Sequence, residues 1–378
     1  MKKYNRIVIS IYIHPDFYPP TINAINNLAE HCNELIVITR NNCKEDFPTG
    51  DNITFIKIGS YITPYEFELK SITIKLFTFL KFTFKVLQFS LSNKTSLIIN
   101  YDPIPLFSFY LINWMLSCKI KKWYHNHDIP EISSNNKYSI GWFAAKFEQM
   151  GLKKMNYFTL PSNERLEYYP NLSSETIYNL IPNYPSLKIY NKPQKINIEN
   201  VEIIKIIYQG SIGKGHAIEE IILLLKKQIS NKKLKLVLKG PVREQYKKNL
   251  DDIAIANNVE KNLDWIGVGL YKDLQAITKT CHIGIAIYKG TDVMNKTLGT
   301  ASNKIYEYAA CGLPILVFDN EQFRKYLSKY KWVVFTDGSI ESMQSSIKYI
   351  IDNYNELSTQ ARKDFEQYFN FDNYFKKY

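Results

Sequence analysis

Several common sequence features are missing from this 378-residue chain, and each absence argues against a class of protein. The five cysteines are odd in number and include no Cys-x-x-Cys pair, so neither a disulfide framework nor a zinc site is expected. Neither Gly-x-x-x-x-Gly-Lys-Ser/Thr nor Gly-x-Gly-x-x-Gly occurs, which disfavours a Walker ATPase and a nicotinamide dehydrogenase. No Asp-x-Asp occurs either, which removes a common carboxylate arrangement for holding a metal-linked nucleotide.

Long uncharged apolar runs are also missing. The apolar run at residues 7–11 is short and leads into a polar turn, so we expect a first strand rather than a signal peptide. The least polar long stretch, residues 72–91, is interrupted by Lys75, Lys81 and Lys85, and no transmembrane helix is expected. We therefore expect a cytoplasmic protein.

The composition is that of a folded protein with an excess of positive charge. Hydrophobic residues make up 45% and aromatic residues 14% of a chain whose length suits two domains. The net charge of +12 predicts an anionic partner: nucleic acid, a phosphorylated small molecule or an anionic membrane surface. In residues 69–94, lysines alternate with phenylalanines. This pattern fits a helix on a lipid surface and equally a helix packed on a sheet, because both need an amphipathic helix.

Short apolar strands alternate with helical patterns along most of the chain, which predicts an α/β protein with parallel sheets. The strands are expected at residues 6–12, 34–39, 54–58, 96–100, 121–125 and 157–160 in the first half, and at 202–209, 234–239, 263–267, 283–287 and 315–318 in the second. Residues 183–200 are rich in Pro, Asn and Lys and show no clear period, so we place a linker there. The predicted domains are residues 1–185 and 186–362, both Rossmann-like. A C-terminal helix at about 363–378 is expected to pack back on the first domain.

The segment 302–317 combines a polar helix start, one carboxylate and a following strand. Ser302 is a candidate N-cap, and Gly312 and Pro314 are stop signals. Asn303 and Glu307 are four residues apart and therefore share a face at the positive end of the helix. A carboxylate accepts two hydrogen bonds from a vicinal diol such as a ribose. The alternative is an ordinary capped helix before a buried strand.

A glycine-rich turn at residues 208–216 connects a strand to a helix. Its glycines allow backbone N–H groups to approach an anion, and Lys214 adds a positive charge. The alternative is a purely structural connection, since glycine is the common residue of tight turns.

The third candidate site, residues 123–131, lies at the carboxyl end of a first-domain strand, where open α/β sheets bind ligands. His125 and His127 share one face, and Asp128 follows them. A metal is not expected, because a site normally needs three or four converging ligands and the other histidines lie in unrelated contexts.

Taken together, these residues resemble the GT-B-fold glycosyltransferases, in particular glycosyltransferase family 4, over most of the chain. The resemblance rests on the turn at 210–215, the segments 236–241, 263–267 and 271–274, and above all residues 302–314. It implies two Rossmann-like domains whose parallel sheets face each other across a cleft. It also implies a retaining, metal-independent transferase that needs no cofactor beyond its nucleotide-sugar donor, with UDP-sugar favoured.

The resemblance assigns roles to individual residues. Glu307 would accept from the ribose hydroxyls, and Lys214 would offset the charge on the departing diphosphate. His127 would lie near the transferred sugar, which makes His127 and Lys214 the predicted catalytic residues. The predicted donor-binding residues are Gly210, Ser211, Gly213, Lys214, Gly215, His216, Lys239, Gly240, Ser302, Asn303, Lys304 and Glu307. The predicted acceptor-side residues are Tyr18, Pro20, Thr21, His125 and Asp128.

Two positions depart from the pattern of the family. Gly299 stands where many members have a second glutamate, and Ser211 stands where many have arginine, with His216 as a partial substitute. The resulting prediction is a hexosyltransferase-type enzyme that adds a sugar to a lipid-linked or other cell-surface glycan precursor, such as one for capsule or lipopolysaccharide. It would work at the cytoplasmic face of an anionic membrane and bind no nucleic acid. The alternatives are a GT-B-fold epimerase or phosphorylase, and a non-catalytic basic protein that binds anionic lipid or nucleic acid.

Overall fold

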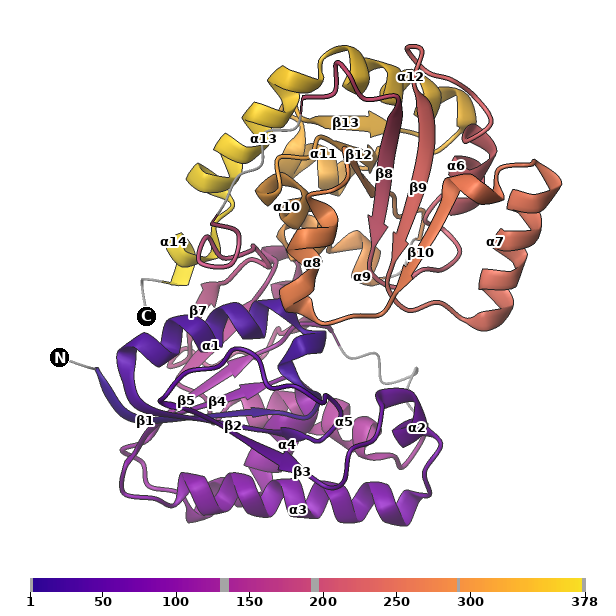
Figure 1. The fold of residues 1–378 in the computed structure, drawn as a ribbon. Helices are drawn as coiled ribbons and strands as arrows, with labels where there is room; N and C mark the ends of the chain where they lie inside the picture. The colour runs from indigo at the N-terminus through magenta and orange to yellow at the C-terminus, as the bar shows by residue number, and fades with distance from the viewer. Residues whose placement is uncertain (1–2, 130–135, 192–196, 291–292, 376–378) are drawn as a thin grey trace. The chain divides into compact units, whose positions relative to one another are not determined.

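The computed structural model describes residues 3–129, 136–191, 197–290 and 293–375. The chain forms two compact units, one reaching Pro182 and including Tyr374 and Phe375, the other spanning Asn183–Asn373. Each unit contains one sheet in which all paired strands are parallel (Figure 1). The predicted α/β class with two parallel sheets is therefore confirmed. Within the described residues, no helix is both long and apolar enough to cross a membrane.

The first unit has a seven-stranded sheet with the strand order β3-β2-β1-β4-β5-β6-β7. The order reverses between β1 and β4, and this is where open parallel sheets form a crevice at the carboxyl ends of their strands. The strands are β1 (Tyr4–Ile11), β2 (Cys32–Arg40), β3 (Ile53–Ile58), β4 (Thr95–Tyr101), β5 (Lys121–His125), β6 (Tyr157–Leu160) and β7 (Ile177–Leu180). The helices are α1 (Pro19–His31), α2 (Pro64–Glu68), α3 (Ile72–Ser90), α4 (Pro103–Ile112) and α5 (Ile140–Leu152).

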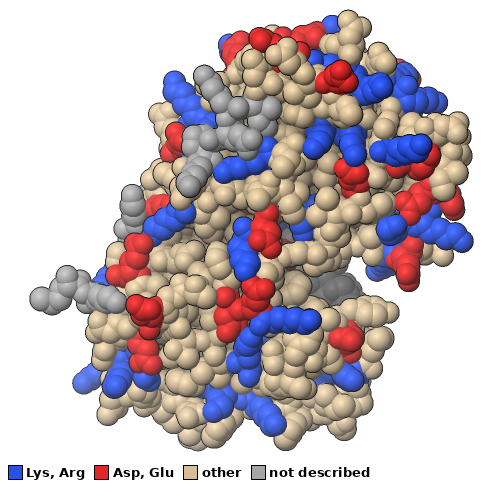
Figure 2. Space-filling view, viewed as in Figure 1, with Lys and Arg blue, Asp and Glu red and all other residues tan. Residues whose placement is uncertain are grey.

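Helix α3 packs on the sheet with one face and exposes large apolar side chains on the other. Phe79, Phe82 and Val86 are buried at the three- and four-residue spacing of a helix face. Phe77 and Phe84, in contrast, are 59% and 62% exposed. The lower edge of the view in Figure 2, where α3 runs, shows mainly blue and tan atoms. Packing on the sheet, one of the two interpretations of residues 69–94, therefore explains only the inner face.

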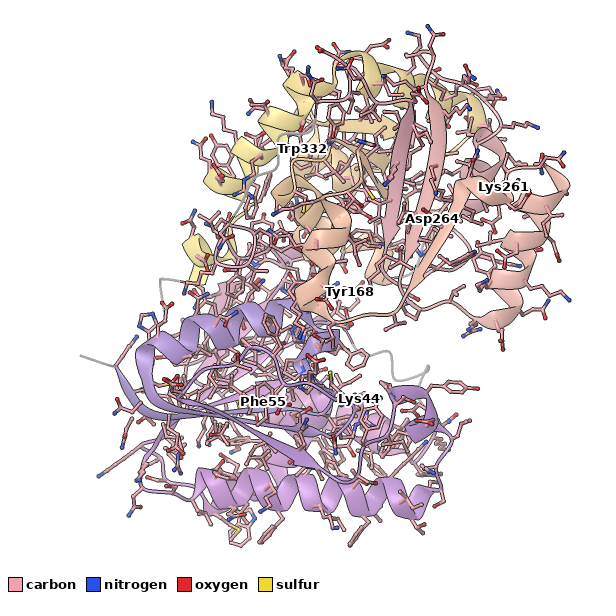
Figure 3. All side chains as sticks on the ribbon, in the orientation of Figure 1. Lys44, Phe55, Tyr168, Lys261, Asp264 and Trp332 are labelled. Atoms are coloured by element: carbon pink, nitrogen blue, oxygen red, sulfur yellow. The ribbon has the colours of Figure 1, made fainter. Side chains whose placement is uncertain are left out.

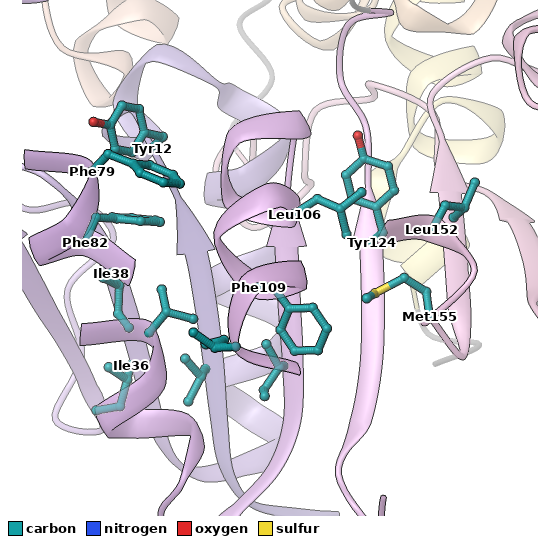
Figure 4. Close-up of a cluster of buried hydrophobic side chains, with 14 of the residues drawn as sticks. Tyr12, Ile36, Ile38, Phe79, Phe82, Leu106, Phe109, Tyr124, Leu152 and Met155 are labelled. Carbon is teal, nitrogen blue, oxygen red and sulfur yellow. The ribbon is translucent and has the colours of Figure 1, made fainter. Parts of the chain in front are cut away.

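The core of the first unit lies between the sheet and helices α3, α4 and α5. Tyr12, Phe79 and Phe82 meet at one end of this cluster, and Phe109 and Tyr124 lie further along it (Figure 4). Edge-to-face contacts join Tyr12 to both phenylalanines, with ring centroids 6.3 and 5.1 Å apart. The backbone that follows β1 is thereby fixed at the carboxyl edge of the sheet.

The second unit has a six-stranded sheet with the order β10-β9-β8-β11-β12-β13, which reverses between β8 and β11. Its strands are β8 (Ile203–Gln209), β9 (Lys233–Lys239), β10 (Leu263–Gly267), β11 (Ile283–Ala286), β12 (Ile315–Phe318) and β13 (Val333–Thr336). Its helices are α6 (Ile218–Leu224), α7 (Glu244–Ala256), α8 (Tyr271–Thr278), α9 (Val293–Lys296), α10 (Asn303–Ala310), α11 (Glu321–Leu327), α12 (Ile340–Asp352), α13 (Tyr354–Tyr368) and α14 (Phe371–Phe375).

The C-terminal helices complete both units. Trp332 immediately precedes the last strand (Figure 3). It is fully buried and donates from Nε1 to Asp364 of α13 over 2.9 Å. The chain breaks its helix between Tyr368 and Phe371. Phe375 then stacks on Trp123 of β5, with ring centroids 5.7 Å apart.

Candidate functional site

The ends of β8 and β9 are held unusually close at the sheet reversal of the second unit. Gly240 has φ +140°, and a Cβ added to it would lie 2.0 Å from the carbonyl oxygen of Gly210. Only glycine fits there, because the obstacle is backbone. Gly210 in turn donates its N–H to the carbonyl of Lys239 over 2.9 Å. The predicted glycine turn therefore begins directly at the mouth of the sheet.

Glu307 is buried beside this turn. Only 4% of the residue is exposed, although its helix lies at the carboxyl edge of the sheet. The side-chain amide of Gln209, the last residue of β8, donates to Glu307 Oε2 over 2.5 Å, and Tyr271 of α8 also hydrogen-bonds the carboxyl. Thr278 orients the amide by donating to Gln209 Oε1 over 2.9 Å. Burial outweighs these bonds and raises the pKa of Glu307 to about 7.

Lys304 lies one helical turn before Glu307 and reaches over the end of β8. Its Nζ is 3.9 Å from the ring centroid of Tyr208 and 4.8 Å from that of Tyr288. A Cβ added to Gly210 would lie 3.2 Å from the same Nζ. Burial lowers the pKa of Lys304, while the charge of Glu307 acts in the opposite direction. The amino group of Lys304 is therefore held close to the turn by aromatic rings.

Lys214 is exposed and lines a cavity of about 560 Å³ together with Ser211, Gly213 and Arg243. Tyr208, at the end of β8, donates its hydroxyl to the carbonyl of Ser211 over 2.8 Å, which fixes the start of the turn. The predicted residues Gly210 to Gly215 thus form one turn, with Lys304 close to Gly210 and Lys214 lining the adjoining cavity.

Among the other predicted donor residues, two hydrogen-bond backbone carbonyls and one has a buried oxygen without a partner in the described part of the chain. Lys239 is buried and donates from Nζ to the carbonyl of Gly267 over 3.1 Å, joining the ends of β9 and β10. His216 donates from Nδ1 to the carbonyl of Ile287 over 2.8 Å, and burial lowers its pKa. Asn303, at the first turn of α10, has a buried Oδ1 without a hydrogen-bond partner among the described residues.

The prediction that the Ser302 side chain caps α10 is wrong. The residue occupies the N-cap position, but its hydroxyl makes no capping bond and instead meets the hydroxyl of Tyr288 at 3.1 Å. The sequence pattern could not reveal this, because Tyr288 lies in the segment that follows β11.

Gly299, where the family resemblance led us to expect a glutamate, lies against an aromatic ring. A Cβ added to it would be 2.9 Å from Cε2 of Tyr326, and its φ is +21°. A longer side chain at this position would require Tyr326 of α11 to move. The packing of this unit therefore favours glycine at position 299.

The first unit gathers its predicted residues around His127, which is 2% exposed. The ring Nδ1 lies 3.0 Å from Oδ2 of Asp102, and the backbone N–H of His127 donates to Oδ1 of the same carboxylate over 2.8 Å. Nε2 lies 3.1 Å from the hydroxyl of Thr21, in the first turn of α1 after Pro20. We infer that Asp102 holds the ring proton on Nδ1, because a carboxylate only accepts.

Aromatic rings enclose His127 on both sides. Tyr18 stacks on one face with centroids 4.7 Å apart, and Tyr101 on the other at 5.2 Å. His125 is buried alongside, 4.7 Å away ring to ring, with Nδ1 2.8 Å from the hydroxyl of Thr159. Both ring nitrogens of His127 are engaged by Asp102 and Thr21, which leaves neither free for a metal in this arrangement.

Two charged residues flank this histidine. Arg165 is buried, donates to the carbonyl of His127 and lies 3.8 Å from the carboxylate of Asp128. Asp128 itself is exposed, with 57% of its side chain accessible. Asp102 and Arg165 were absent from the predicted site. The sequence could have indicated Asp102, because it directly follows a buried strand at the sheet edge. Arg165 comes from a 3₁₀ segment that is distant in the sequence, and no motif predicted its position.

A buried carboxyl group is hydrogen-bonded to Asn126, the residue before His127. Glu148 of α5 is 5% exposed and accepts at Oε1 from Tyr124 at 2.5 Å, Tyr169 at 2.8 Å and Asn126 at 2.9 Å. Burial nevertheless raises the pKa of Glu148 to about 7. The folded protein therefore favours the protonated carboxyl in this network.

The stability of the protein should fall as Glu148 ionises. Its pKa is raised from 4.5 to about 7, so its contribution is complete below pH 4.5 and is lost as the pH rises through 7. A Glu148→Gln variant cannot ionise and should remove roughly 2–3 kcal/mol of the decrease in unfolding free energy between pH 5 and pH 8. Urea unfolding at several pH values measures this.

The matched control is Glu167→Gln, which changes an exposed glutamate of the same unit. It should leave the pH profile unchanged. Parallel profiles for native protein and Glu148→Gln would show that Glu148 does not titrate in this range.

Sequence comparison places the second unit in a known family. Residues 191–368 match the family described as Glycosyl transferases group 1. This region contains the glycine turn, Lys304 and Glu307. No curated protein matches the chain by sequence.

Solved structures resemble the chain over nearly its full length. Sucrose-phosphate synthase from Thermosynechococcus elongatus has a TM-score of 0.70 at 13% identity, covering 99% of this chain and 97% of its own. Anabaena Alr3699/HepE in complex with UDP and glucose has a TM-score of 0.68 at 12% identity, covering 99% and 98%. WaaG, a glycosyltransferase involved in lipopolysaccharide biosynthesis, has a TM-score of 0.62 at 11% identity, covering 98% of each chain.

At these identities the structures show the fold, and the family match shows the kind of enzyme. The chain is a GT-B-fold glycosyltransferase whose residues 191–368 form a group 1 glycosyl transferase domain.

Proposed function

We propose that this enzyme transfers a sugar from a UDP-sugar to a lipid-linked or other cell-surface glycan precursor, with retention of configuration and without a metal. The observation that carries the proposal is the buried Glu307 next to the glycine turn of the second unit. HepE, which shares the fold, was crystallised with UDP and glucose, which supports uracil as the base. WaaG, with the same fold, belongs to lipopolysaccharide biosynthesis, which supports the class of acceptor.

Glu307 is suited to bind a ribose. A carboxylate accepts from both hydroxyls of a vicinal diol, and Gln209 and Tyr271 already hold this one in a fixed orientation. The two ribose hydroxyls would favour the ionised form that burial disfavours. Nucleotide binding is therefore expected to lower the pKa of Glu307.

Two lysines are placed to offset the charge of the departing diphosphate. Lys304 lies over the start of the turn, and Lys214 stands in the adjoining cavity with Arg243. Positive groups fixed where negative charge develops stabilise the transition state and take the place that a metal ion occupies in other transferases. Ser211 cannot supply the positive charge that arginine gives in many relatives, so these lysines carry a larger share.

His127 is our candidate for the group beside the transferred sugar. Asp102 and Thr21 fix the ring at its two nitrogens, and Tyr18 and Tyr101 fix its plane. Such a rigid ring orients a sugar hydroxyl at little entropic cost. We infer a positioning role in the transfer rather than metal binding.

The outer face of α3 supports a role at a membrane surface. Ile72, Phe77 and Phe84 are 74%, 59% and 62% exposed, and the lysines of this helix lie among them. The helix contains no acidic residue. A helix with exposed aromatic side chains and lysines binds the interface of anionic lipids. We therefore place the first unit on the cytoplasmic face of an anionic membrane.

The donor proposal predicts that UDP stabilises the enzyme to heat in the presence of EDTA. At 100 times its dissociation constant, a ligand adds about 2.7 kcal/mol to the stability of the state that binds it. Lys304→Gln and Lys214→Ala should each reduce the shift in melting temperature at a fixed UDP concentration, because each removes a charge that faces the diphosphate. Differential scanning fluorimetry measures both shifts.

Lys348→Gln, an exposed lysine on α12, serves as the control and should keep the native shift. A shift that appears only when a divalent cation is added would contradict metal independence. Equal shifts in all variants would contradict the assignment of the lysines.

The membrane proposal predicts binding to vesicles that contain an anionic lipid. The native chain should co-sediment with phosphatidylglycerol vesicles and dissociate at high salt, because the attraction is partly electrostatic. A Phe77→Ser, Phe84→Ser double variant should bind at least about tenfold more weakly, since each exposed ring contributes buried apolar area.

An Ile255→Ser variant is the matched control, because Ile255 of α7 is 60% exposed in the second unit. It should bind as the native protein does. Equal binding by the double variant would remove α3 from the membrane surface.

A further inference from the structure

A cavity of about 260 Å³ opens beside the His127 cluster of the first unit. Its polar lining consists of Tyr12, Tyr18, Arg40 and Asp102, and prolines and aliphatic residues form the remainder. Tyr18 and Asp102 also contact His127 directly. The cavity is therefore continuous with the residues that we place next to the transferred sugar.

The polar residues come from three neighbouring strands. Arg40 ends β2, Tyr12 follows β1 and Asp102 follows β4. These strands are adjacent in the sheet, and β1 and β4 flank the point at which the strand order reverses. Ligands of open α/β sheets bind at this position, outside the carboxyl ends of the strands.

Arg40 is a buried cation whose charge is not paired. It is 6% exposed, and its only described hydrogen bond runs from Nε to the carbonyl of Tyr12 over 2.8 Å. Its guanidinium packs 4.0 Å from the ring centroid of Phe67, and among the described residues no carboxylate forms an ion pair with it. The nearest acidic influence is Glu68, at the end of α2, which acts only through its charge. Nη1 is buried without a partner.

The hydroxyl of Tyr12 is also buried without a hydrogen-bond partner among the described residues. The residue is 8% exposed. Burial raises the pKa of Tyr12 to about 12, so the hydroxyl keeps its proton and remains a donor. Two buried donors thus line one cavity, and buried polar groups normally have partners. Leaving a buried charge unpaired is especially unfavourable.

We propose that this cavity binds an oxyanion carried by the acceptor, with the guanidinium of Arg40 and the hydroxyl of Tyr12 as its donors. The inference rests on the proposed function in one respect, that the bound molecule is the acceptor sugar. A carboxylate fits best, because one planar guanidinium pairs with one carboxylate through two parallel hydrogen bonds. An acidic sugar held here would reach toward Tyr18 and His127 with its hydroxyl groups.

The specificity of the enzyme then follows from charge. An uncharged sugar would leave the Arg40 cation without a partner, whereas a sugar acid would neutralise it. Asp102 lines the same cavity and would repel an anion placed beside it, which directs the carboxylate toward Arg40. The acceptor is thereby oriented in one way.

The test is to titrate the native chain with methyl glucuronide, glucose 1-phosphate and methyl glucoside, using isothermal titration calorimetry. Methyl glucuronide should bind at least about tenfold more tightly than methyl glucoside, as expected for hydrogen bonds to a charged group. A preference for glucose 1-phosphate over methyl glucuronide would assign the oxyanion to a phosphate instead. Equal binding of all three sugars would overturn the proposal.

Variants test which residues cause the preference for the anionic sugar. Arg40→Gln should abolish the preference for the anionic sugar, and Tyr12→Phe should reduce it by removing one hydroxyl. Arg40→Lys keeps the charge and tests the fork geometry should the glutamine variant fail to fold. Arg6→Gln is the matched control, because Arg6 lies at the opposite end of β1 and pairs with Glu34 at 2.7 Å. A preference that survives both Arg40 variants and Tyr12→Phe would contradict the assignment.

The melting-temperature shift with UDP, measured on the same variants, separates this inference from the proposed function. It should be unchanged in Arg40→Gln, since the donor residues lie in the second unit. Anion binding without any response to UDP would support the oxyanion cavity and overturn the donor assignment. A response to UDP without anion binding would do the reverse.

Discussion

The burial of Glu307 is the constraint on which the second unit depends. A carboxyl group that is 4% exposed has to be matched by partners, and these come from three elements: Gln209 at the end of β8, Tyr271 of α8 and Lys304 of its own helix. Lys304 in turn is held by the rings of Tyr208 and Tyr288. The strand ends, the glycine turn and α10 are thereby tied into one arrangement at the edge of the sheet.

The two units use the same position in their sheets for different chemistry. In the second unit, glycines and lysines prepare backbone N–H groups and positive charge for a diphosphate. In the first, side chains of Tyr12, Arg40 and Asp102 occupy the corresponding strand ends and form a polar cavity beside His127. This division agrees with a donor bound by the second unit and an acceptor bound by the first, as we propose.

The sequence predicted the architecture well because periodicity and strand composition are local properties. The strands from β1 to β6 and from β8 to β12 lie where alternating and apolar runs indicated them. The strands β7 and β13, each at one edge of its sheet, were not predicted. The glycine turn and the predicted helix near Glu307 were found from motifs that are continuous in the chain.

The missed features depend on contacts between distant segments. Ser302 looks like a cap, yet its hydroxyl meets Tyr288 instead. Arg165 and Glu148 reach the His127 cluster from a 3₁₀ segment and a helix, and no spacing in the sequence predicts their positions. Asp102 could have been predicted, because it directly follows a buried strand. The unpaired Arg40 is likewise visible only once its surroundings are known.

The central claim of this account is that Glu307 binds the ribose of the nucleotide. Calorimetric dissociation constants for UDP and 2′-deoxy-UDP, measured with native enzyme and with Glu307→Gln, test it most directly. Native enzyme should favour UDP by roughly tenfold or more, because a hydrogen bond to a charged group is lost with the hydroxyl, and the variant should show a much smaller preference. An equal preference for UDP in both proteins would contradict the claim.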